Sequence, residues 1–150
     1  MSSKLKKLLE AINYHDDNSE LDNCSLSKIQ IEKDNTWVII INSDNLISID
    51  TYNKLLMCLK ENFTEVNDVV LRIEVANIDN SKISLYFENI IHSLADSNSK
   101  YNVFKDRTIN IKDNTVVIDI YNIVEKEDIK SSSKYIAESL SNYGFNITNI

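Results

Sequence analysis

The chain has 150 residues, of which 43% are hydrophobic, and its formal net charge at pH 7 is −7. A chain of about 150 residues buries roughly 70% of its surface on folding, so this length suffices for one self-contained core. One glycine and no proline exclude a glycine-rich phosphate loop, a dinucleotide-binding fingerprint and a PxxP ligand. A pI near 4.8 argues against nucleic-acid binding, which requires clustered cations.

Targeting signals are not evident in the sequence. No apolar stretch reaches the length of about 18 residues that a membrane span needs. Near the N-terminus, Lys4, Lys6 and Lys7 alternate with leucine, a pattern that lacks the apolar core of a signal peptide. Cys24 and Cys58 have no CxxC partner, which favours two free thiols in a reducing compartment over a zinc site. We therefore expect a cytoplasmic protein that is neither secreted nor spans a membrane.

The first half of the chain predicts a helix, a β-hairpin, a second helix and a strand. Leu5, Leu8, Leu9 and Ile12 have the spacing of one helix face, and Ser48 can cap the second helix. The second strand is continuously apolar, as expected for a strand buried on both faces. The predicted elements are a helix over 3–14, a connector over 15–24, strands over 27–32 and 37–41, a helix over 49–63 and a strand over 69–75.

The second half repeats this order of elements. The first predicted turn has the sequence Lys-Asp-Asn-Thr, from Lys33 to Thr36. The same four residues recur 79 positions later, from Lys112 to Thr115. These are common turn residues that can recur by chance, so a true duplication stays open. Gly144 ends the last helix, because glycine takes a positive φ without cost. The predicted elements are a helix over 83–94, strands over 108–111 and 116–120, a helix that includes 129–143 and a strand over 145–150.

The order of elements predicts an α+β fold with two successive α-β-β-α-β units, 1–78 and 79–150. We expect their helices to pack on small mixed sheets and the two units to pack together as one globular domain. This order is similar to that of KH modules, which grip nucleic-acid backbones through a Gly-x-x-Gly loop. Gly144 is the only glycine, so this loop is missing and the expected fold is pseudo-KH-like.

Possible polar sites each have a simpler structural explanation. The run His15, Asp16 and Asp17 could hold a metal or move a proton, but adjacent loop residues point in different directions, and His92 is the only other histidine. Negative charge before or within the first turn of the last helix complements the helix dipole. The acidic residues there are Glu125, Glu127 and Asp128.

Neither a nucleophile nor a base-stacking surface is predicted. Ser131, Ser132 and Ser133 have no histidine placed to activate a hydroxyl, and they fit a polar helix face. Five aromatic residues have apolar or uncharged polar neighbours rather than cations, which favours core packing over base stacking: Trp37, Tyr52, Tyr86, Phe87 and Tyr101. The sequence therefore predicts no catalytic, cofactor-binding or metal-binding residues.

A longer pattern carries a family resemblance. A leucine-rich helix with Leu8 and Leu9 comes first, Trp37 opens the second strand, and Leu46 and Tyr52 flank the start of the next helix. With the strand over 69–75, this pattern resembles the extreme N-terminal region of the PolC-type DNA polymerase III alpha subunit, the replicative polymerase of low-GC Gram-positive bacteria. The likeness continues through the second hairpin to Tyr143, Gly144 and Phe145. One departure is Ile47, where the family has proline.

The resemblance implies a protein-docking role. In this family the region is similar to the pseudo-KH C-terminal domain of the clamp-loader tau subunit, while the polymerase and 3′–5′ exonuclease centres, with their divalent metals, lie in other domains. The resemblance thus implies a non-catalytic domain without a cofactor that docks replisome proteins, the tau subunit first, and binds no DNA, membrane or small molecule. The alternative is a module that handles template nucleic acid through Lys4, Lys6, Lys7, Lys54 and Lys60. A stand-alone enzyme is disfavoured, because no catalytic constellation is present.

Overall fold

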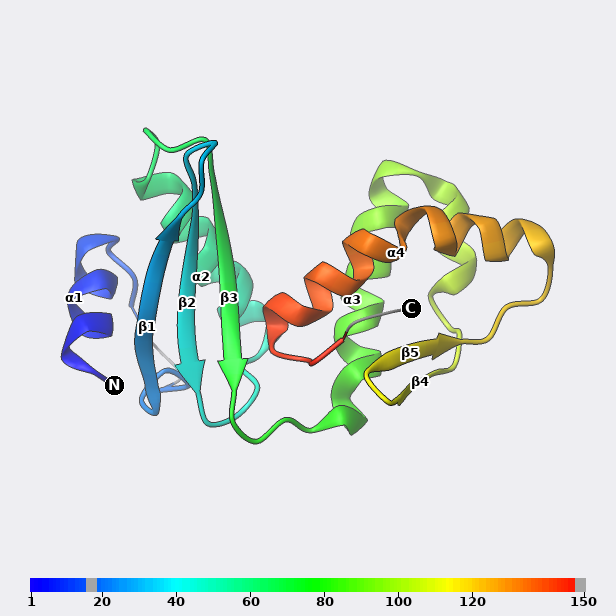
Figure 1. The fold of residues 1–150 in the computed structure, drawn as a ribbon, viewed down its shortest axis with the longest axis horizontal. Coiled ribbons are helices and arrows are strands. Elements are labelled where there is room, and N and C mark those ends of the chain that lie inside the picture. Colours follow the sequence, from blue (N-terminus) through cyan, green and yellow to red (C-terminus); the bar gives the residue numbers. More distant parts are fainter. Residues whose placement is uncertain (16–18, 148–150) are drawn as a thin grey trace. The chain divides into compact units, whose positions relative to one another are not determined.

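The computed structural model describes residues 1–15 and 19–147, and these residues have an α+β fold (Figure 1). They divide into two compact units. The first comprises Met1–Ile78 with Asn142–Gly144, and the second comprises Asp79–Ser141 with the residues from Phe145 onwards. None of the described helices is long and apolar enough to cross a bilayer.

The first unit is built on a three-stranded sheet in the order β1-β2-β3. β1 (Cys24–Ile31) pairs antiparallel with β2 (Thr36–Ser43), and β2 pairs parallel with β3 (Asp68–Val75). Parallel neighbours need a crossover connection, and α2 (Ile49–Asn62) supplies it behind the sheet in Figure 1. α1 (Ser3–Ala11) precedes β1. The predicted order helix, hairpin, helix, strand is therefore confirmed for this unit.

Side-chain caps fix the helix ends. The hydroxyls of Ser2 and Ser48 accept the N–H groups of Leu5 and Thr51, each at 3.2 Å, so the predicted cap at Ser48 is confirmed. α1 ends at Ala11, earlier than predicted, because Asn13 takes a φ of 56°. The Tyr14 N–H then donates to the Leu9 carbonyl at 2.9 Å, which closes a Schellman motif.

The core of the first unit surrounds β2. Val38, Ile39, Ile40 and Ile41 are all buried, as predicted for a strand covered on both faces. The buried residues of α2 and β3 that complete this core are Tyr52, Leu55, Leu59, Val69, Leu71 and Ile73. By contrast Ile29 and Ile31 of β1 are exposed.

The second unit packs helices on a two-stranded hairpin. Its interior consists mainly of aromatic and aliphatic side chains from both long helices and their flanking segments: Tyr86, Phe87, Ile90, Ile91, Phe104, Ile136, Leu140 and Phe145. The elements are η1 (Asn80–Lys82), α3 (Ile83–Ser97), η2 (Ser99–Phe104), β4 (Ile109–Lys112), β5 (Thr115–Ile118) and α4 (Ile123–Tyr143).

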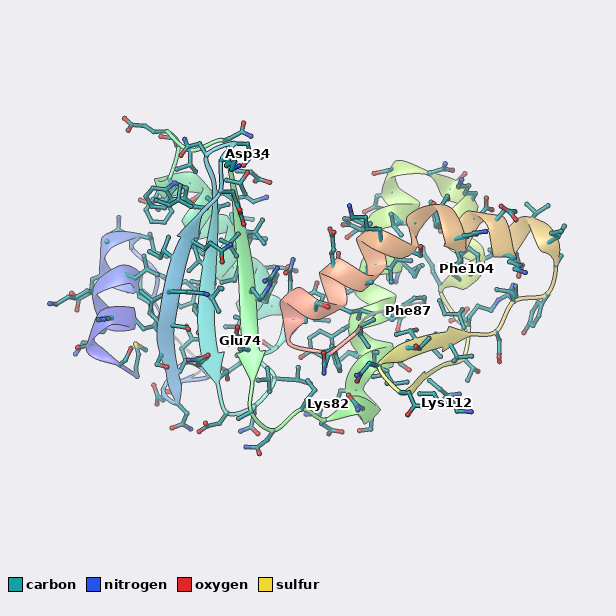
Figure 2. The ribbon with its side chains drawn as sticks, in the orientation of Figure 1. Asp34, Glu74, Lys82, Phe87, Phe104 and Lys112 are labelled. Carbon is teal, nitrogen blue, oxygen red and sulfur yellow. The ribbon has the colours of Figure 1, made fainter. Side chains whose placement is uncertain are left out.

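The two hairpins share a four-residue turn sequence but differ in turn geometry. In the second, Asp113 and Asn114 both have positive φ, at 50° and 62°, as a two-residue type I′ turn requires. In the first, only Asn35 has positive φ, and the Glu32 N–H donates to the Thr36 carbonyl at 2.8 Å. Figure 2 labels Asp34 in the first turn and Lys112 beside the second. The repeated letters therefore do not encode a repeated geometry.

One expectation for the second unit is wrong, and two of its features were not predicted. The six-residue 3₁₀ segment η2 was not predicted, and α4 begins at Ile123, ahead of the apolar face from which the helix was inferred. The described part of 145–150 forms no strand, because the Phe145 N–H donates to the Leu140 carbonyl and the Ile147 N–H donates to the Phe145 carbonyl, each at 3.1 Å. Ile150 lies outside the described residues. The described second unit is thus α-β-β-α, and the pseudo-KH likeness stays a prediction.

Gly144 is required where it stands. Its φ is 118°, and an added Cβ would overlap Val75 Cγ2 and lie 3.2 Å from the Ile73 carbonyl oxygen. Both features penalise any side chain. The predicted helix end at Gly144 is therefore confirmed, with close backbone packing as a second reason for glycine.

We expect Gly144→Ala to lower the free energy of unfolding by about 1–3 kcal/mol, the usual cost of one strained backbone position. Urea unfolding of the variant and the wild-type chain measures this difference. Ser139→Ala is the control, because Ser139 lies inside α4 and the change is compatible with helical backbone. Equal losses in the two variants would contradict the role given to Gly144.

Candidate protein-interaction surface

Exposed apolar side chains gather where β5 leads into α4. Single exposed apolar residues are normal, but several of them within a short segment make that segment a candidate interaction surface. Five such side chains occur within eight consecutive residues, and Tyr121 is the most exposed of them at 77%. We call residues 117–124 the β5–α4 segment. Its exposed apolar members are Val117, Ile120, Tyr121, Ile123 and Val124.

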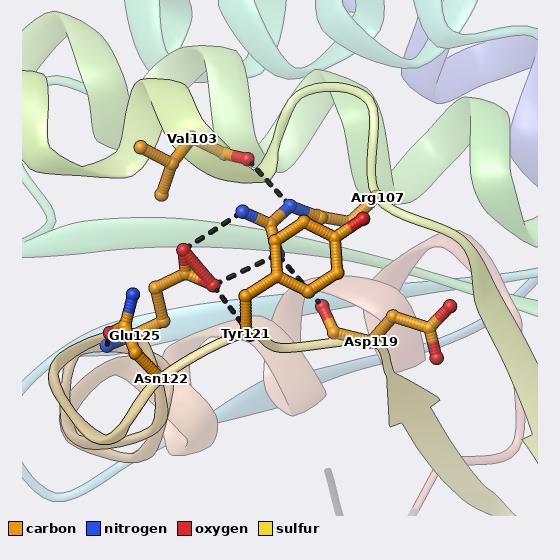
Figure 3. Close-up of polar contacts among 6 residues, drawn as sticks. All are labelled: Val103, Arg107, Asp119, Tyr121, Asn122 and Glu125. Carbon is orange, nitrogen blue, oxygen red and sulfur yellow. Dashed lines mark hydrogen bonds and ion pairs between the residues drawn. The ribbon is translucent and has the colours of Figure 1, made fainter.

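A buried ion pair anchors this segment. Arg107 Nη1 and Nη2 donate to Glu125 Oε1 and Oε2, both at 2.8 Å, so the pair is bidentate (Figure 3). Each side chain is only 11% exposed. A bidentate pair fixes orientation as well as distance, because two parallel hydrogen bonds must align together.

Further contacts hold the backbone of the segment (Figure 3). The Tyr121 N–H donates to Glu125 Oε1 at 2.9 Å, and Asn122 Oδ1 accepts the Glu125 N–H at 2.9 Å, as a helix cap does. Arg107 Nε donates to the Val103 carbonyl at 3.0 Å, and its guanidinium lies 3.7 Å from the Tyr121 ring centroid. The backbone that presents the apolar side chains is therefore held by several contacts within the chain.

The same contacts lower the pKa of Glu125. The backbone N–H of Tyr121 and the guanidinium of Arg107 both stabilise the carboxylate, so the pKa of Glu125 lies below its ordinary value of 4.5. The carboxylate is therefore charged at neutral pH, which the bidentate pair requires.

An open groove lies beside the segment, between β5 and the N-terminal half of α4. Its volume is about 530 Å³, within the range of roughly 300–1,000 Å³ common for binding clefts. The lining residues from α4 are Lys126, Ile129, Lys130 and Ser133, which lie on one helix face. β5 contributes all four of its residues, and Ile120 completes the lining.

Of the candidate polar run at His15, the structure describes only the histidine. His15 is exposed and its carbonyl accepts Lys54 Nζ at 2.8 Å, while Asp16 and Asp17 lie outside the described residues. His92 pairs with Glu88 on its own helix at 3.7 Å. Across residues 1–15 and 19–147, no three histidine, cysteine, aspartate or glutamate side chains are grouped to hold a metal ion.

The aromatic residues considered for base stacking pack against the protein itself. Tyr52, Tyr86, Phe87 and Tyr101 are buried, which confirms core packing, and Trp37 is half-buried against Phe63 with ring centroids 5.5 Å apart. Neither Cys24 nor Cys58 forms a disulfide among the described residues, and Cys24 Sγ lies 3.8 Å from the Glu20 carbonyl oxygen.

The acidic and serine residues of α4 also contact the protein itself. Glu125 belongs to the first turn as expected, whereas Asp128 lies in the second turn and pairs with Lys100 at 3.4 Å; Glu127 is exposed. The hydroxyls of Ser131 and Ser133 donate to carbonyls three residues earlier, and Ser132 bonds the Tyr101 hydroxyl.

Two of the five lysines proposed for template binding are engaged elsewhere. Lys60 pairs with Asp68 at 3.7 Å, and Lys54 reaches both a backbone carbonyl and the Tyr14 ring. Sequence reasoning missed the β5–α4 segment. The available signal was the apolar group Tyr121, Ile123 and Val124, which fitted no face of a predicted element.

The lowered pKa of Glu125 predicts a pH dependence of stability. Because the pKa is lower in the folded chain, ionised Glu125 stabilises the fold above about pH 4.5, and this stabilisation is lost as the pH falls through the folded-state value. We expect Glu125→Gln to be less stable than wild type at neutral pH, with a difference that shrinks on acidification below that point. Urea midpoints across the pH range measure it, with exposed Glu127→Gln as control. A difference independent of pH would contradict the assignment.

Comparison with known proteins gives a family for the first unit. Residues 4–73 match the family model described as DNA polymerase III polC-type N-terminus I. A DNA polymerase III PolC-type from Oceanobacillus iheyensis is 27% identical over 132 residues, which cover 85% of this chain and 9% of that protein. The chain therefore spans a small part of its relative's length. No solved structure matches the chain.

The family match lies over α1 to β3, the elements that carry Leu8, Leu9, Trp37 and Tyr52, on which the sequence resemblance was based. The β5–α4 segment lies beyond the residues matched by the family model. Residues 4–73 therefore match the N-terminal region of the PolC-type DNA polymerase III family, and the similarity to the Oceanobacillus protein extends over most of the chain.

Proposed function

We propose that the chain is a non-catalytic docking domain of a PolC-type replicative polymerase and that it binds replisome proteins, with the clamp-loader tau subunit as the first candidate. The observation that carries this proposal is the β5–α4 segment, where five exposed apolar side chains lie on a backbone fixed by Arg107 and Glu125. An ordered apolar surface binds protein well, because little conformational entropy is lost on association.

Docking by this domain would serve the whole polymerase. By family resemblance the parent enzyme is a DNA-directed DNA polymerase with a 3′–5′ exonuclease and divalent metal ions, and it acts in the bacterial cytoplasm. A domain that contacts another replisome protein would hold the polymerase at the replication fork. Its own residues then need no catalytic group, cofactor, membrane contact or small-molecule ligand.

The alternative is that the domain guides template nucleic acid. The net charge of −7 opposes this, because phosphate binding depends on the release of counterions by clustered cations. Lys4, Lys6 and Lys7 are exposed on α1, but Lys54 and Lys60 already contact other parts of the first unit. Protein docking is therefore the better-supported function.

A paired titration separates the two functions. The chain is titrated at near-physiological salt against the cognate tau subunit and against labelled primer–template DNA. We expect saturable binding to tau at micromolar or lower concentration and none to DNA. Binding to DNA that weakens steeply with added salt, without binding to tau, would overturn the docking proposal in favour of template handling.

Charged substitutions locate the docking surface. We expect the double variant Ile123→Asp with Val124→Asp to bind tau about tenfold more weakly or worse, the loss that follows when interface anchors are removed. Both positions lie in the first turn of α4, where an acidic side chain is compatible with the helix dipole, so the fold should persist.

Leu85→Asp is the matched control for the double variant. Leu85 is 60% exposed and lies in the first turn of α3, so the change also places an acid on an exposed apolar helix start. Circular dichroism checks that all variants are folded. Equal loss of binding in the control and the double variant would show that added negative charge, rather than the β5–α4 segment, controls binding.

A further inference from the structure

The sheet of the first unit has an outer edge along β1. Its strand order is β1-β2-β3, so among the described strands β1 pairs with β2 alone (Figure 1). At the end of β1, the Glu32 N–H donates to the Thr36 carbonyl at 2.8 Å and so points towards β2. These directions alternate along an antiparallel strand, and the register is regular from Lys28 to Ile31. The N–H and carbonyl groups of Ile29 and Ile31 therefore point away from β2.

This stretch of the edge is accessible. Every residue from Lys28 to Glu32 is exposed, and Ile29 and Ile31 are 38% and 61% exposed. Within residues 1–15 and 19–147, no backbone hydrogen bond outside the pairing of β1 with β2 involves Ile29 or Ile31. An exposed edge with unpaired backbone groups is a template for one more strand.

The accessible stretch is bounded at both ends. On the N-terminal side, the Ser2 hydroxyl accepts the Leu26 N–H at 3.4 Å and the Ser2 N–H donates to the Cys24 carbonyl at 3.1 Å. These contacts occupy the edge before the register shift that lies between Leu26 and Lys28. On the C-terminal side the chain turns towards β2 after Glu32. The open edge therefore consists of residues 28–32, about 17 Å at the usual rise per residue.

The sequence of this open edge is self-complementary. In an antiparallel pair with the two copies of Gln30 opposite each other, Ile29 lies opposite Ile31 of the second copy. Both residues direct their N–H and carbonyl groups outwards, so each such pair exchanges two hydrogen bonds, and the two-fold axis generates the pair twice. The pairing ends at Glu32, before the stretch of edge that Ser2 occupies.

Charge complementarity supports the same register. Lys28 lies opposite Glu32 of the second copy, and opposite charges in this position stabilise a strand pair. Among the described side chains neither residue has an ion pair, although Glu32 Oε1 accepts Gln30 Nε2 at 3.0 Å. A shift of the two-fold axis to Ile29 or Ile31 separates Lys28 from Glu32 and loses both ion pairs.

We propose that two copies of the chain associate through β1 in the antiparallel register centred on Gln30, so that their two sheets become one continuous sheet. The exposed side chains of Ile29 and Ile31 from both copies then lie together on one face. A second copy fits this edge because the hydrogen-bonding groups, the isoleucines and the charges are all matched by the chain's own sequence. The edge belongs to the first unit and the β5–α4 segment to the second, so this inference goes beyond docking and does not depend on it.

Sedimentation equilibrium of the 150-residue chain, from micromolar to millimolar concentration, tests the association. Five residues a side form a small interface, so we expect a reversible dimer whose population rises with concentration. Lys28→Glu places like charges opposite each other twice and should weaken dimerisation about tenfold or more. Lys134→Glu is the matched control, because it makes the same charge change at an exposed position of α4, and it should leave the dimer unchanged.

Charge exchange tests the register itself. Glu32→Lys should weaken dimerisation as Lys28→Glu does, whereas the chain that carries both substitutions should dimerise like the wild type, because both ion pairs are restored. Mixed in equal amounts, the two single variants should form a heterodimer, since the glutamates of one then lie opposite the lysines of the other. The mixture should therefore have a higher average mass than either variant alone.

The backbone contribution is tested separately. Ile29→Pro removes an outward N–H and leaves the hydrogen bonds between β1 and β2 in place, a substitution that edge strands tolerate. We expect this variant to remain monomeric with the circular dichroism of the wild type. If it does not fold, the charge variants decide the question alone. In the wild type, amide hydrogen exchange at Ile29 and Ile31 should slow as the concentration of the chain rises.

Four results would overturn the inference. A chain that stays monomeric at millimolar concentration does not associate through β1. A dimer that neither Lys28→Glu nor Ile29→Pro weakens uses another surface. Failure of the two single charge variants to associate with each other contradicts the register centred on Gln30. Slow exchange at Ile29 and Ile31 in the dilute, monomeric chain would show that the edge is already covered.

Discussion

The parallel pairing of β2 with β3 is the constraint on which the first unit depends. A tight turn cannot join parallel neighbours, so α2 must return the chain across one face of the sheet. The Tyr52 hydroxyl on α2 donates to the Leu71 carbonyl of β3 at 2.5 Å, in a buried position that ties the crossover to the strand it leads to. β2 thus becomes the central strand, and its four consecutive aliphatic residues are buried as a result.

Elements that are marked by a clear sequence feature, such as an apolar run, a helix cap or a terminal glycine, could be predicted from the sequence. The central strand has a continuous aliphatic run, α2 has the cap Ser48 and an apolar face, and α4 ends at the only glycine. The start of α4 could not be predicted, because Ile123 and Val124 are exposed and disrupt the apolar periodicity from which helices are recognised. The alternation of Phe145 and Ile147 resembled a strand, but local hydrogen bonds hold that backbone instead.

The exposed β5–α4 segment was missed by sequence reasoning for a related reason. Its apolar residues are no different in type from those of the core, and only their exposure distinguishes them. The contacts that keep them exposed join Arg107 to Glu125, 18 residues apart, across the intervening hairpin. A single sequence contains no signal for that pairing. The net negative charge of the chain, which is evident from the sequence, also obscured the two lysines that line the groove, Lys126 and Lys130.

The position of Trp37 makes the first unit optically distinct. It is the only tryptophan in the chain, it packs on Phe63, and its indole N–H donates to Asn35 Oδ1 at 3.2 Å. Its fluorescence therefore reports the environment of the first unit, whereas far-ultraviolet circular dichroism records the helices of both. Coincident denaturation curves from the two signals would mean that the units lose structure together, and separate curves would reveal two cooperative blocks within one chain.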